Sequence, residues 1–301
     1  MSKTNIEWCK RPGTLPEVWN VVTGCTKVSQ GCKNCYAEVM HKRLQKMMPT
    51  KYNHEFLTGA VEHSDLLTLP LKWKKPRTVF VNSMSDLFHE KVSFEFINSV
   101  FTVMADCDKH TFIILTKRPE RILEFIQWKK KQLMQITWMP SDNVWIGVSV
   151  EDQKTANERI PILLKIPSTI RFLSCEPLLG DINIADATKT SVIAKGFSYL
   201  NFQTIDWVIV GGESGKNARP MHLDWAISIK NQCKAANVPF FFKQWGEWGK
   251  IKPGQIGKPY FPNKLASVDD GNKNFVEMVK YGKHNTGNEL HGNIYQEFPK
   301  V

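Results

Sequence analysis

Short, almost wholly apolar runs recur along this chain, and each is followed at once by polar residues. Such runs suit strands buried on both faces, because a strand with one wet face alternates apolar and polar side chains. Strands of that kind belong to parallel sheets that helices cover. Six runs have this form: TVFVNSMSD at 78–86, HTFIILTKRP at 110–119, NVWIGVSVED at 143–152, IRFLSCEPL at 170–178, DWVIVGGESG at 206–215 and VPFFFKQWG at 238–246. We predict parallel strands in all six, and a shorter seventh strand in WNVVTG at 19–24.

Helical periodicity separates several of these runs, as parallel crossover connections require. FEFINSVFTVMAD at 94–106 repeats apolar residues at helical spacing, and PERILEFIQWKKKQLMQ at 119–135 begins with a proline. YAEVMHKRLQKMM at 36–48 predicts a further helix, and the mixed pattern of 181–204 predicts a helix and a loop. Alternating strands and helices predict an α/β fold, a (β/α) barrel that is partial or open.

The chain length suits one such barrel with an addition at its C-terminal end. The 301 residues, 42% of them hydrophobic, are enough for a sizeable core. After Trp245 the strand and helix pattern gives way to a charged stretch rich in Gly and Pro. We expect a barrel domain over residues 1–250 and a C-terminal extension over 251–301. No window reaches about 18 consecutive apolar residues, and the polar start predicts no signal peptide, so we expect a cytoplasmic protein without membrane contact.

The polar residues that follow the runs are the first candidates for a site. The C-terminal ends of parallel barrel strands lie on one face, so these residues should meet there. Together they offer partners for the amine, carboxylate and ribose groups of a ligand. The plain alternative is that strand ends are polar because they meet water. The residues collected are Asn82, Ser83, Ser85, Asp86, Thr116, Lys117, Arg118, Ser149, Glu151, Ser174, Glu176, Gly211, Gly212, Glu213, Ser214, Lys243 and Gln244.

Three of the seven cysteines, Cys25, Cys32 and Cys35, are clustered in GCTKVSQGCKNCYAE at 24–38. Three thiols do not complete the four-ligand shell of a structural zinc ion, and an odd number does not pair off into disulfides. A [4Fe-4S] cluster held by three thiolates keeps one iron open for another ligand. Zinc is the rival interpretation, with His41 or Cys9 as the fourth ligand, although the chain has no second close cysteine pair.

Taken together, these motifs resemble a known pattern. Three cysteines in a loop after the first strand of a (β/α) barrel are similar to the radical S-adenosylmethionine superfamily, whose cysteines hold a [4Fe-4S] cluster. The resemblance is closer to a phage- and bacteria-associated family of three-cysteine-motif proteins. It rests, over about residues 5–250, on GCTKVSQGCKNCYAE, VFVNSMSDLFHE, FIILTKRPERI, NVWIGVSVEDQ, RFLSCEPLLG, DWVIVGGESG, ARPM and FFFKQWGEW.

The resemblance implies a cofactor set and residue roles. Cys25, Cys32 and Cys35 would each ligate one iron, and S-adenosylmethionine would bind the fourth through its amino and carboxylate groups. An electron donor such as a flavodoxin or ferredoxin would drive cleavage of the sulfonium bond to a 5′-deoxyadenosyl radical. We assign catalytic roles to Lys117, Glu151, Glu176 and Glu213, and cofactor-binding roles to Tyr36, Asn82, Ser83, Ser85, Asp86, Ser149, Ser174, Gly211 and Gly212.

Two features depart from the superfamily pattern. The usual spacing is C-x3-C-x2-C with an aromatic residue before the third cysteine, whereas here the first gap is six residues and Tyr36 follows the third cysteine. The GGE motif that holds the methionine amine normally ends the second strand, whereas here it ends a late strand. Asp86 is therefore the positional candidate for the amine, and Glu213 is the chemical one.

The net charge of +11 and the pI near 9.2 favour a polyanionic partner. Clustered Lys and Arg bind phosphate backbones by releasing counterions, although a solvated basic surface explains the same charge. Two alternatives follow. One is a nucleic-acid-binding protein that is non-catalytic or contains zinc, and the other is a radical enzyme that modifies a nucleic-acid base or nucleotide. The sequence names neither the substrate nor the oligomeric state.

Overall fold

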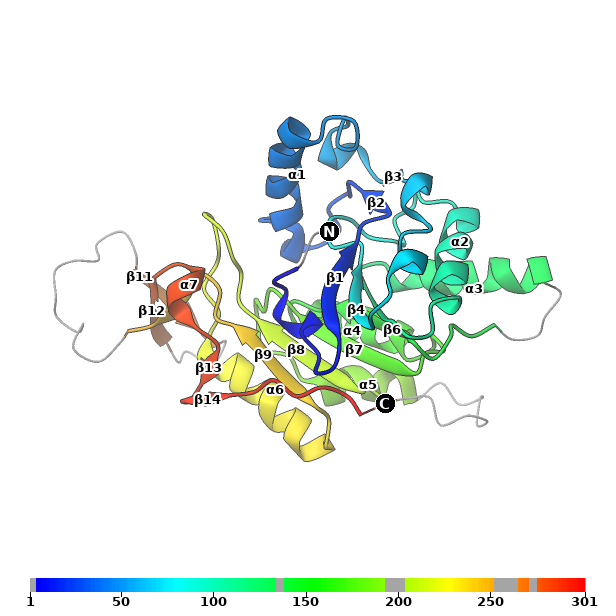
Figure 1. The fold of residues 1–301 in the computed structure, drawn as a ribbon. Helices are drawn as coiled ribbons and strands as arrows, with labels where there is room; N and C mark the ends of the chain where they lie inside the picture. Colours follow the sequence, from blue (N-terminus) through cyan, green and yellow to red (C-terminus); the bar gives the residue numbers. More distant parts are fainter. Residues whose placement is uncertain (1–3, 134–137, 193–203, 252–264, 271–274, 301) are drawn as a thin grey trace.

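The computed structural model describes residues 4–133, 138–192, 204–251, 265–270 and 275–300. Its main element is a seven-stranded parallel sheet, curled into a half-barrel, in which the strands follow one another in chain order (Figure 1). The strands are β1 (Leu15–Trp19), β4 (Arg77–Val81), β5 (Thr111–Thr116), β6 (Val144–Ser149), β7 (Ile170–Cys175), β8 (Trp207–Gly211) and β9 (Phe240–Gln244). The predicted α/β fold with an open, barrel-like sheet is thus confirmed, as are all six strands predicted from the apolar runs.

The seventh strand was predicted in the wrong place. The first strand of the sheet is β1, which ends at the residue where the predicted strand began. The predicted segment instead holds β2 (Val22–Thr23), which pairs with β3 (Val61–Glu62) in a small antiparallel ribbon. β1 contains Pro16 and the buried Glu17, so it lacks an apolar run. It tolerates both because it is an edge strand, where a proline breaks no ladder, and because Arg77 pairs with Glu17 at 2.7 Å.

Helices join the strands and cover the outer face of the sheet. They are α2 (Phe94–Ala105), α3 (Pro119–Leu133), α4 (Gln153–Leu163), α5 (Ile184–Val192) and α6 (Leu223–Ala236). Three begin at side-chain caps: Ser93 accepts from the Phe96 amide, Asp152 forms a capping box with Thr155, and His222 accepts from the Asp224 amide. α1 (Tyr36–Met47) follows the cysteine loop and stands above the sheet, clear of the other helices (Figure 1). The helices predicted over 36–48, 94–106 and 119–135 are confirmed within the described residues, and α5 begins the 181–204 segment, whose residues 193–203 lie outside them.

Alternate side chains of each strand enter two different cores. On β8, Val208 and Val210 pack outward with residues such as Ile229 of α6, whereas Trp207 and Ile209 pack on the concave face. The short helix η1 (Glu7–Cys9) contacts β1, β4 and β9 and adds to this inner core. The inner core consists of Trp8, Cys9, Phe80, Ile113, Trp145, Ile170, Phe172, Trp207, Ile209 and Phe241. The period of two along a strand therefore builds a helix-covered outer face and an aromatic interior from the same runs.

The described residues after β9 add small sheets and then return to the half-barrel. β10 (Trp248–Lys250), β12 (Phe275–Lys280) and β11 (Leu265–Asp269) form an antiparallel sheet, followed by α7 (Lys283–Thr286) and the hairpin of β13 (Glu289–Leu290) and β14 (Asn293–Ile294). Gln296 then bridges to Phe241, and Trp207 Nε1 donates to the Glu297 carbonyl at 2.8 Å. This last segment covers the free edge of β9. The division between residues 250 and 251 stays a prediction.

Among the described residues, no helix has the length and apolar character that crossing a bilayer demands.

Candidate functional site

A cavity of about 490 Å³ lies at the C-terminal ends of the strands. Its volume falls within the range of about 300–1,000 Å³ that is usual for small-molecule sites. Its wall is formed by residues at or just after the C-terminal ends of β4 to β9, together with residues of η1 and of the cysteine loop. The strand ends therefore meet at one cavity, as predicted. The predicted residues that line it are Cys25, Cys32, Cys35, Tyr36, Asn82, Ser83, Ser85, Asp86, Thr116, Lys117, Arg118, Ser149, Ser174, Glu176, Gly212, Glu213, Ser214, Lys243 and Gln244.

Two of the predicted site residues lie just behind the cavity wall. Glu151 is fully buried and pairs with Lys117 Nζ at 2.7 Å. Gly211 faces Glu176, because a Cβ atom there would come within 3.1 Å of the Glu176 carboxylate. Each therefore shapes a residue that does line the cavity.

The cavity exists because inward side chains become small toward the strand ends. On β6 the inward positions are Trp145, then Gly147, then Ser149, which lines the cavity. A Cβ atom on Gly147 would lie 2.5 Å from ring atoms of Phe172, so only glycine fits there without a shift. The aromatic inner core thus forms the floor, and small residues leave the space above it.

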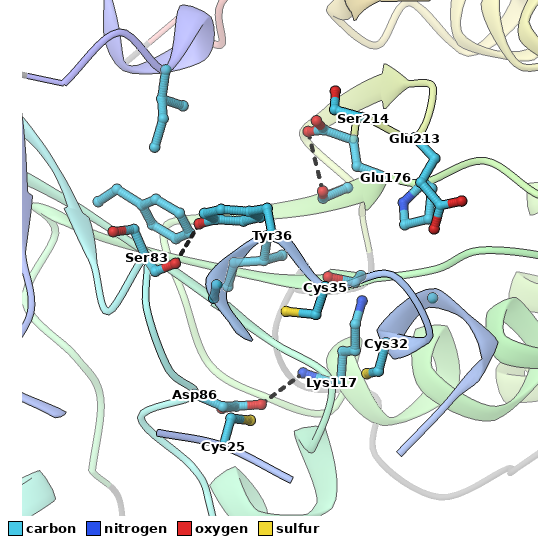
Figure 2. Close-up of a pocket in the computed structure, with 18 of the residues that line it drawn as sticks. Cys25, Cys32, Cys35, Tyr36, Ser83, Asp86, Lys117, Glu176, Glu213 and Ser214 are labelled. Atoms are coloured by element: carbon cyan, nitrogen blue, oxygen red, sulfur yellow. Dashed lines mark hydrogen bonds between the residues drawn. The ribbon is translucent and has the colours of Figure 1, made fainter. Parts of the chain in front are cut away.

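The three cysteines approach the cavity from one loop. Cys25 follows β2, Cys32 ends the short helix η2 (Gln30–Cys32), and Cys35 directly precedes α1. Figure 2 shows their sulfur atoms facing a common space beside Lys117. Burial raises the pKa of Cys25 to about 12 and also raises the pKa of Cys35, and the nearby Cys32 charge adds to both effects. Metal binding at this site would therefore displace protons from the thiols.

Three thiols can bind either one metal ion or an iron–sulfur cluster, and the two require different spacings of the sulfur atoms. Within the described part of the chain, no three His, Cys, Asp or Glu side chains are close enough to bind one metal ion. A cluster makes a different demand, because each thiolate binds its own iron and the thiols stand apart around it. Arg118 Nη1 donates to Cys25 Sγ at 3.7 Å, so a cation lies beside one of the thiols, where it would offset the negative charge of a bound cluster. The thiols and their cations therefore fit an iron–sulfur cluster, whereas His41 and Cys9, the suggested fourth zinc ligands, do not line the cavity.

Asp86 connects the second sheet strand to the cysteine loop through Arg118. It accepts hydrogen bonds from the Phe88 and Lys117 amides and the Thr116 hydroxyl, and from Arg118 Nη1 at 3.2 Å. Arg118 in turn donates to the carbonyl and hydroxyl oxygens of Thr26, next to Cys25. A carboxylate has about four acceptor sites, so Asp86 is fully occupied.

Glu151 holds the middle of the same loop. Its oxygens accept from Ser29 Oγ at 2.9 Å, from Lys117 Nζ and from Arg159 Nη1 at 3.0 Å. Burial alone would raise the pKa of Glu151, but the charges of Lys117 and Arg159 outweigh it and lower the pKa. A Cβ atom on Gly31 would lie 2.3 Å from Glu151, so the loop backbone packs directly on this carboxylate.

Glu213 holds the end of the loop. It accepts from Asn34 Nδ2 at 3.0 Å and from Arg219, through the Arg219 amide and guanidinium. Arg219 also donates to the Gln30 carbonyl, again within the loop. Burial would raise the pKa of Glu213, but the hydrogen bonds from Arg219 lower it. Oε2 of Glu213 thus accepts three of these hydrogen bonds and Oε1 accepts one, which leaves an acceptor site on Oε1.

Glu176 differs from these three carboxylates. It accepts only from Ser174 Oγ at 3.3 Å and from Lys243 Nζ at 2.6 Å among the described residues. Its side chain and that of Lys243 are 15% and 17% exposed, and both line the cavity. Glu176 therefore keeps acceptor sites free for a ligand, and the Lys243 ammonium keeps donors free.

Sequence reasoning missed the residues that hold the carboxylates. Arg159 lies on α4, Arg219 follows β8, and Ser29 lies inside the cysteine loop. Arg219 stands in the ARPM motif, six residues after Glu213, and that spacing was the available signal. Ser29 and Arg159 carry no comparable signal, because their partner lies at the end of a distant strand.

Tyr36 borders the cavity at the start of α1. Its hydroxyl donates to the Ser83 carbonyl, and its side chain remains 53% exposed (Figure 2). The contact joins the cysteine loop to the end of β4, and the rest of the Tyr36 ring remains accessible. Tyr36 can therefore both pack against the end of β4 and contact a ligand.

Comparisons with known proteins place the chain in one family. Searches of curated proteins and of solved structures gave no match. A family model matches residues 3–299, almost the whole chain. The chain therefore belongs to the DUF5131 family, which is described as a protein of unknown function.

Proposed function

We propose that this protein is an iron–sulfur enzyme of the radical S-adenosylmethionine type. The observation that carries the proposal is that Cys25, Cys32 and Cys35 come from one loop and line the cavity at the strand ends of a half-barrel. These three residues would hold a [4Fe-4S] cluster. When bound, such a cluster with S-adenosylmethionine supplies reductive cleavage of a sulfonium bond and a 5′-deoxyadenosyl radical for hydrogen abstraction.

Asp86, Glu151 and Glu213 have a positioning role in this proposal. Each carboxylate connects the cysteine loop to the end of a different strand, through the contacts described above. Rigid strands place groups more precisely than a free loop does, so three anchors limit the movement of the thiols. The sequence resemblance implies catalytic roles for Glu151 and Glu213. We propose instead that both hold the cysteine loop in place.

Glu176 and Lys243 are assigned to ligand binding. An amine of the ligand needs a carboxylate with free acceptor sites. Asp86 has none left and Glu213 keeps one on Oε1, whereas Glu176 keeps a site on each oxygen. Glu176 therefore takes the amine in this proposal, and Lys243 takes a carboxylate. The aromatic floor below them, with Trp145 and Trp207 each at most 1% exposed, excludes water from that side.

The proposal does not fix the chemical class of the substrate. A nucleic-acid base or nucleotide is the candidate that the net charge of +11 favours, because a polyanion is drawn to a basic protein.

Anaerobic reconstitution tests the proposal. We would incubate the protein with iron and sulfide, and measure iron, sulfide and the electronic spectrum for the parent, Cys32→Ala and Cys107→Ala. Cys107 is buried in the outer core, so Cys107→Ala controls for loss of a thiol away from the cavity. About four irons and four sulfides per chain, lost in Cys32→Ala and kept in Cys107→Ala, support the proposal. Stoichiometric zinc, or equal metal content in both variants, would overturn it.

A further inference from the structure

The outer face of α1 is exposed and apolar, with no partner in the described structure. Of its twelve residues only Ala37 and His41 are fully buried, and both lie on the opposite face. On the outer face Val39 is 71% exposed and Met47 64% exposed. Exposed apolar groups gathered on one side of a helix mark interaction sites more often than chance exposure does.

Cations lie among these apolar side chains. Helical spacing brings Arg43 and Lys46 onto the same stripe as Val39 and Met47. Within the described part of the chain, neither Arg43 nor Lys46 pairs with a carboxylate, and the one acid of the helix, Glu38, is paired with Lys27 at 2.9 Å. The face therefore combines exposed apolar side chains with positive charge that no described carboxylate compensates.

The position of this face relates it to the thiols. Cys35 directly precedes α1, and Tyr36 in its first turn both lines the cavity and is half exposed. A molecule bound along the stripe would therefore lie on the helix that directly follows the cysteine loop and whose first residue borders the cavity.

We infer that the outer face of α1 docks a small acidic redox protein that supplies single electrons to the cavity. The inference rests on the proposed function. One electron leaves the reduced carrier, which is oxidised by one unit, and S-adenosylmethionine takes it as its sulfonium C–S bond breaks into methionine and the 5′-deoxyadenosyl radical. Flavodoxins and ferredoxins are carriers of this class.

The chemistry of the face favours a protein over a nucleic acid. Val39 and Met47 are aliphatic, whereas sequence-tolerant binding of single strands depends on flat aromatic side chains that stack with bases. Met and Arg are enriched in protein interfaces, and weak electron-transfer complexes use small interfaces. Charge complementarity with an acidic carrier would raise the association rate at low salt.

A binding experiment with paired charge reversals tests the inference. Oxidised flavodoxin is titrated into the full chain, the Arg43→Glu/Lys46→Glu variant and the Lys154→Glu/Lys165→Glu variant. Both variants change the net charge equally, and Lys154 and Lys165 are exposed on or just after α4. We expect the α1 variant to bind at least tenfold more weakly and the α4 variant to bind within twofold of the parent. Circular dichroism checks that both variants fold.

Three outcomes would overturn the inference. They are equal weakening by the two variants, no flavodoxin binding by the parent, and loss of binding to a fluorescent single-stranded oligonucleotide in the α1 variant with flavodoxin binding unchanged. Dithionite is a chemical reductant that needs no docking surface. An assay with dithionite therefore distinguishes failure of the docking inference from failure of the proposed function. Cleavage of S-adenosylmethionine with dithionite but no effect of the α1 variant on flavodoxin refutes only the docking site. Absence of a cluster refutes the enzyme class whatever α1 binds.

Discussion

The two ends of the concave face differ although the same strands build both. Toward the N-terminal ends of the strands the inward positions are large and aromatic, and toward the C-terminal ends they are small or polar. The first group comprises Trp145, Phe172, Trp207 and Phe241, and the second comprises Gly147, Ser149, Ser174 and Gly211. A period of two keeps both groups on one face, so stability and ligand space are separated along the strand rather than between faces. We expect substitutions at the two ends to affect different measurements.

The largest effect is expected for Trp207→Ala at the aromatic end. Trp207 is fully buried against Phe172 and Phe241, and its Nε1 donates to the Glu297 carbonyl. Removing the ring should lower the free energy of unfolding by about 3–5 kcal/mol. Urea denaturation measures this, with Ser174→Ala at the cavity end as the control, expected to cost about 1 kcal/mol or less. Equal losses in the two variants would break the comparison.

Gly147→Ala tests the boundary between the two ends. The added methyl group would lie 2.5 Å from the Phe172 ring, so the buried ring must move, which should cost about 1–3 kcal/mol. Gly211→Ala is the matched change, because its methyl group meets only the end of the Glu176 side chain, at 3.1 Å. Urea denaturation should show a smaller loss for Gly211→Ala. A larger loss for that variant would mean that the floor is looser than its packing indicates.

Glu176→Gln tests the assignment of the cavity end to ligand binding. Loss of the negative charge should weaken binding of S-adenosylmethionine to the reconstituted protein about tenfold, which corresponds to about 1.4 kcal/mol. Its iron content should be unchanged. Glu213→Gln should instead lower the iron content, because Glu213 anchors the cysteine loop through Asn34 and Arg219. Equilibrium dialysis and iron analysis of both variants measure these effects, and reversed results would exchange the two roles.

The smallest effect concerns pH, which should separate the buried histidines from the cavity carboxylates in acid. Burial lowers the pKa of His110, before β5, and the charges of Lys109 and Arg77 add to this. The unfolded chain then takes up a proton that the folded chain refuses, so stability should fall as the pH drops below about 6.5. The cavity carboxylates Glu151 and Glu213 have lowered pKa values, so their contribution persists above about 4.3 and is lost as the pH falls through the folded pKa.

Urea unfolding between pH 8 and 3 should therefore show two steps. His110→Phe should flatten part of the upper step and leave the lower one. Three other histidines with lowered pKa values keep the remainder of the upper step: His54, His63 and His89. An upper step of unchanged size in His110→Phe would show that His110 does not take up a proton when the chain unfolds.

Much of the sheet could be predicted because strands buried on both faces are apolar in sequence. Phe240 to Phe242 are all apolar since β9 packs on both faces, and β4 to β8 hold similar apolar runs. β1 could not be found this way. Its Glu17 is buried only because Arg77 from the neighbouring strand pairs with it, and that pairing is invisible before the strands are side by side.

The candidate site divides in the same manner. The strand-end residues were predicted to meet, and most of them do line one cavity. Their roles could not be predicted. Asp86, Glu213 and Glu176 look alike in the sequence, yet the first two each accept four hydrogen bonds from described protein groups and Glu176 accepts two.

The sequence by itself determined the strand and helix order and the collection of three thiols in one loop, because both depend on neighbouring residues. Only the tertiary structure decided which carboxylates hold that loop and which one keeps a free acceptor site on each oxygen in the cavity. Ser29 and Glu151, or Asn34 and Glu213, lie 122 and 179 residues apart in the chain. A hydrogen bond depends on distance and direction in space, and the curl of the sheet sets both for groups so far apart in the chain.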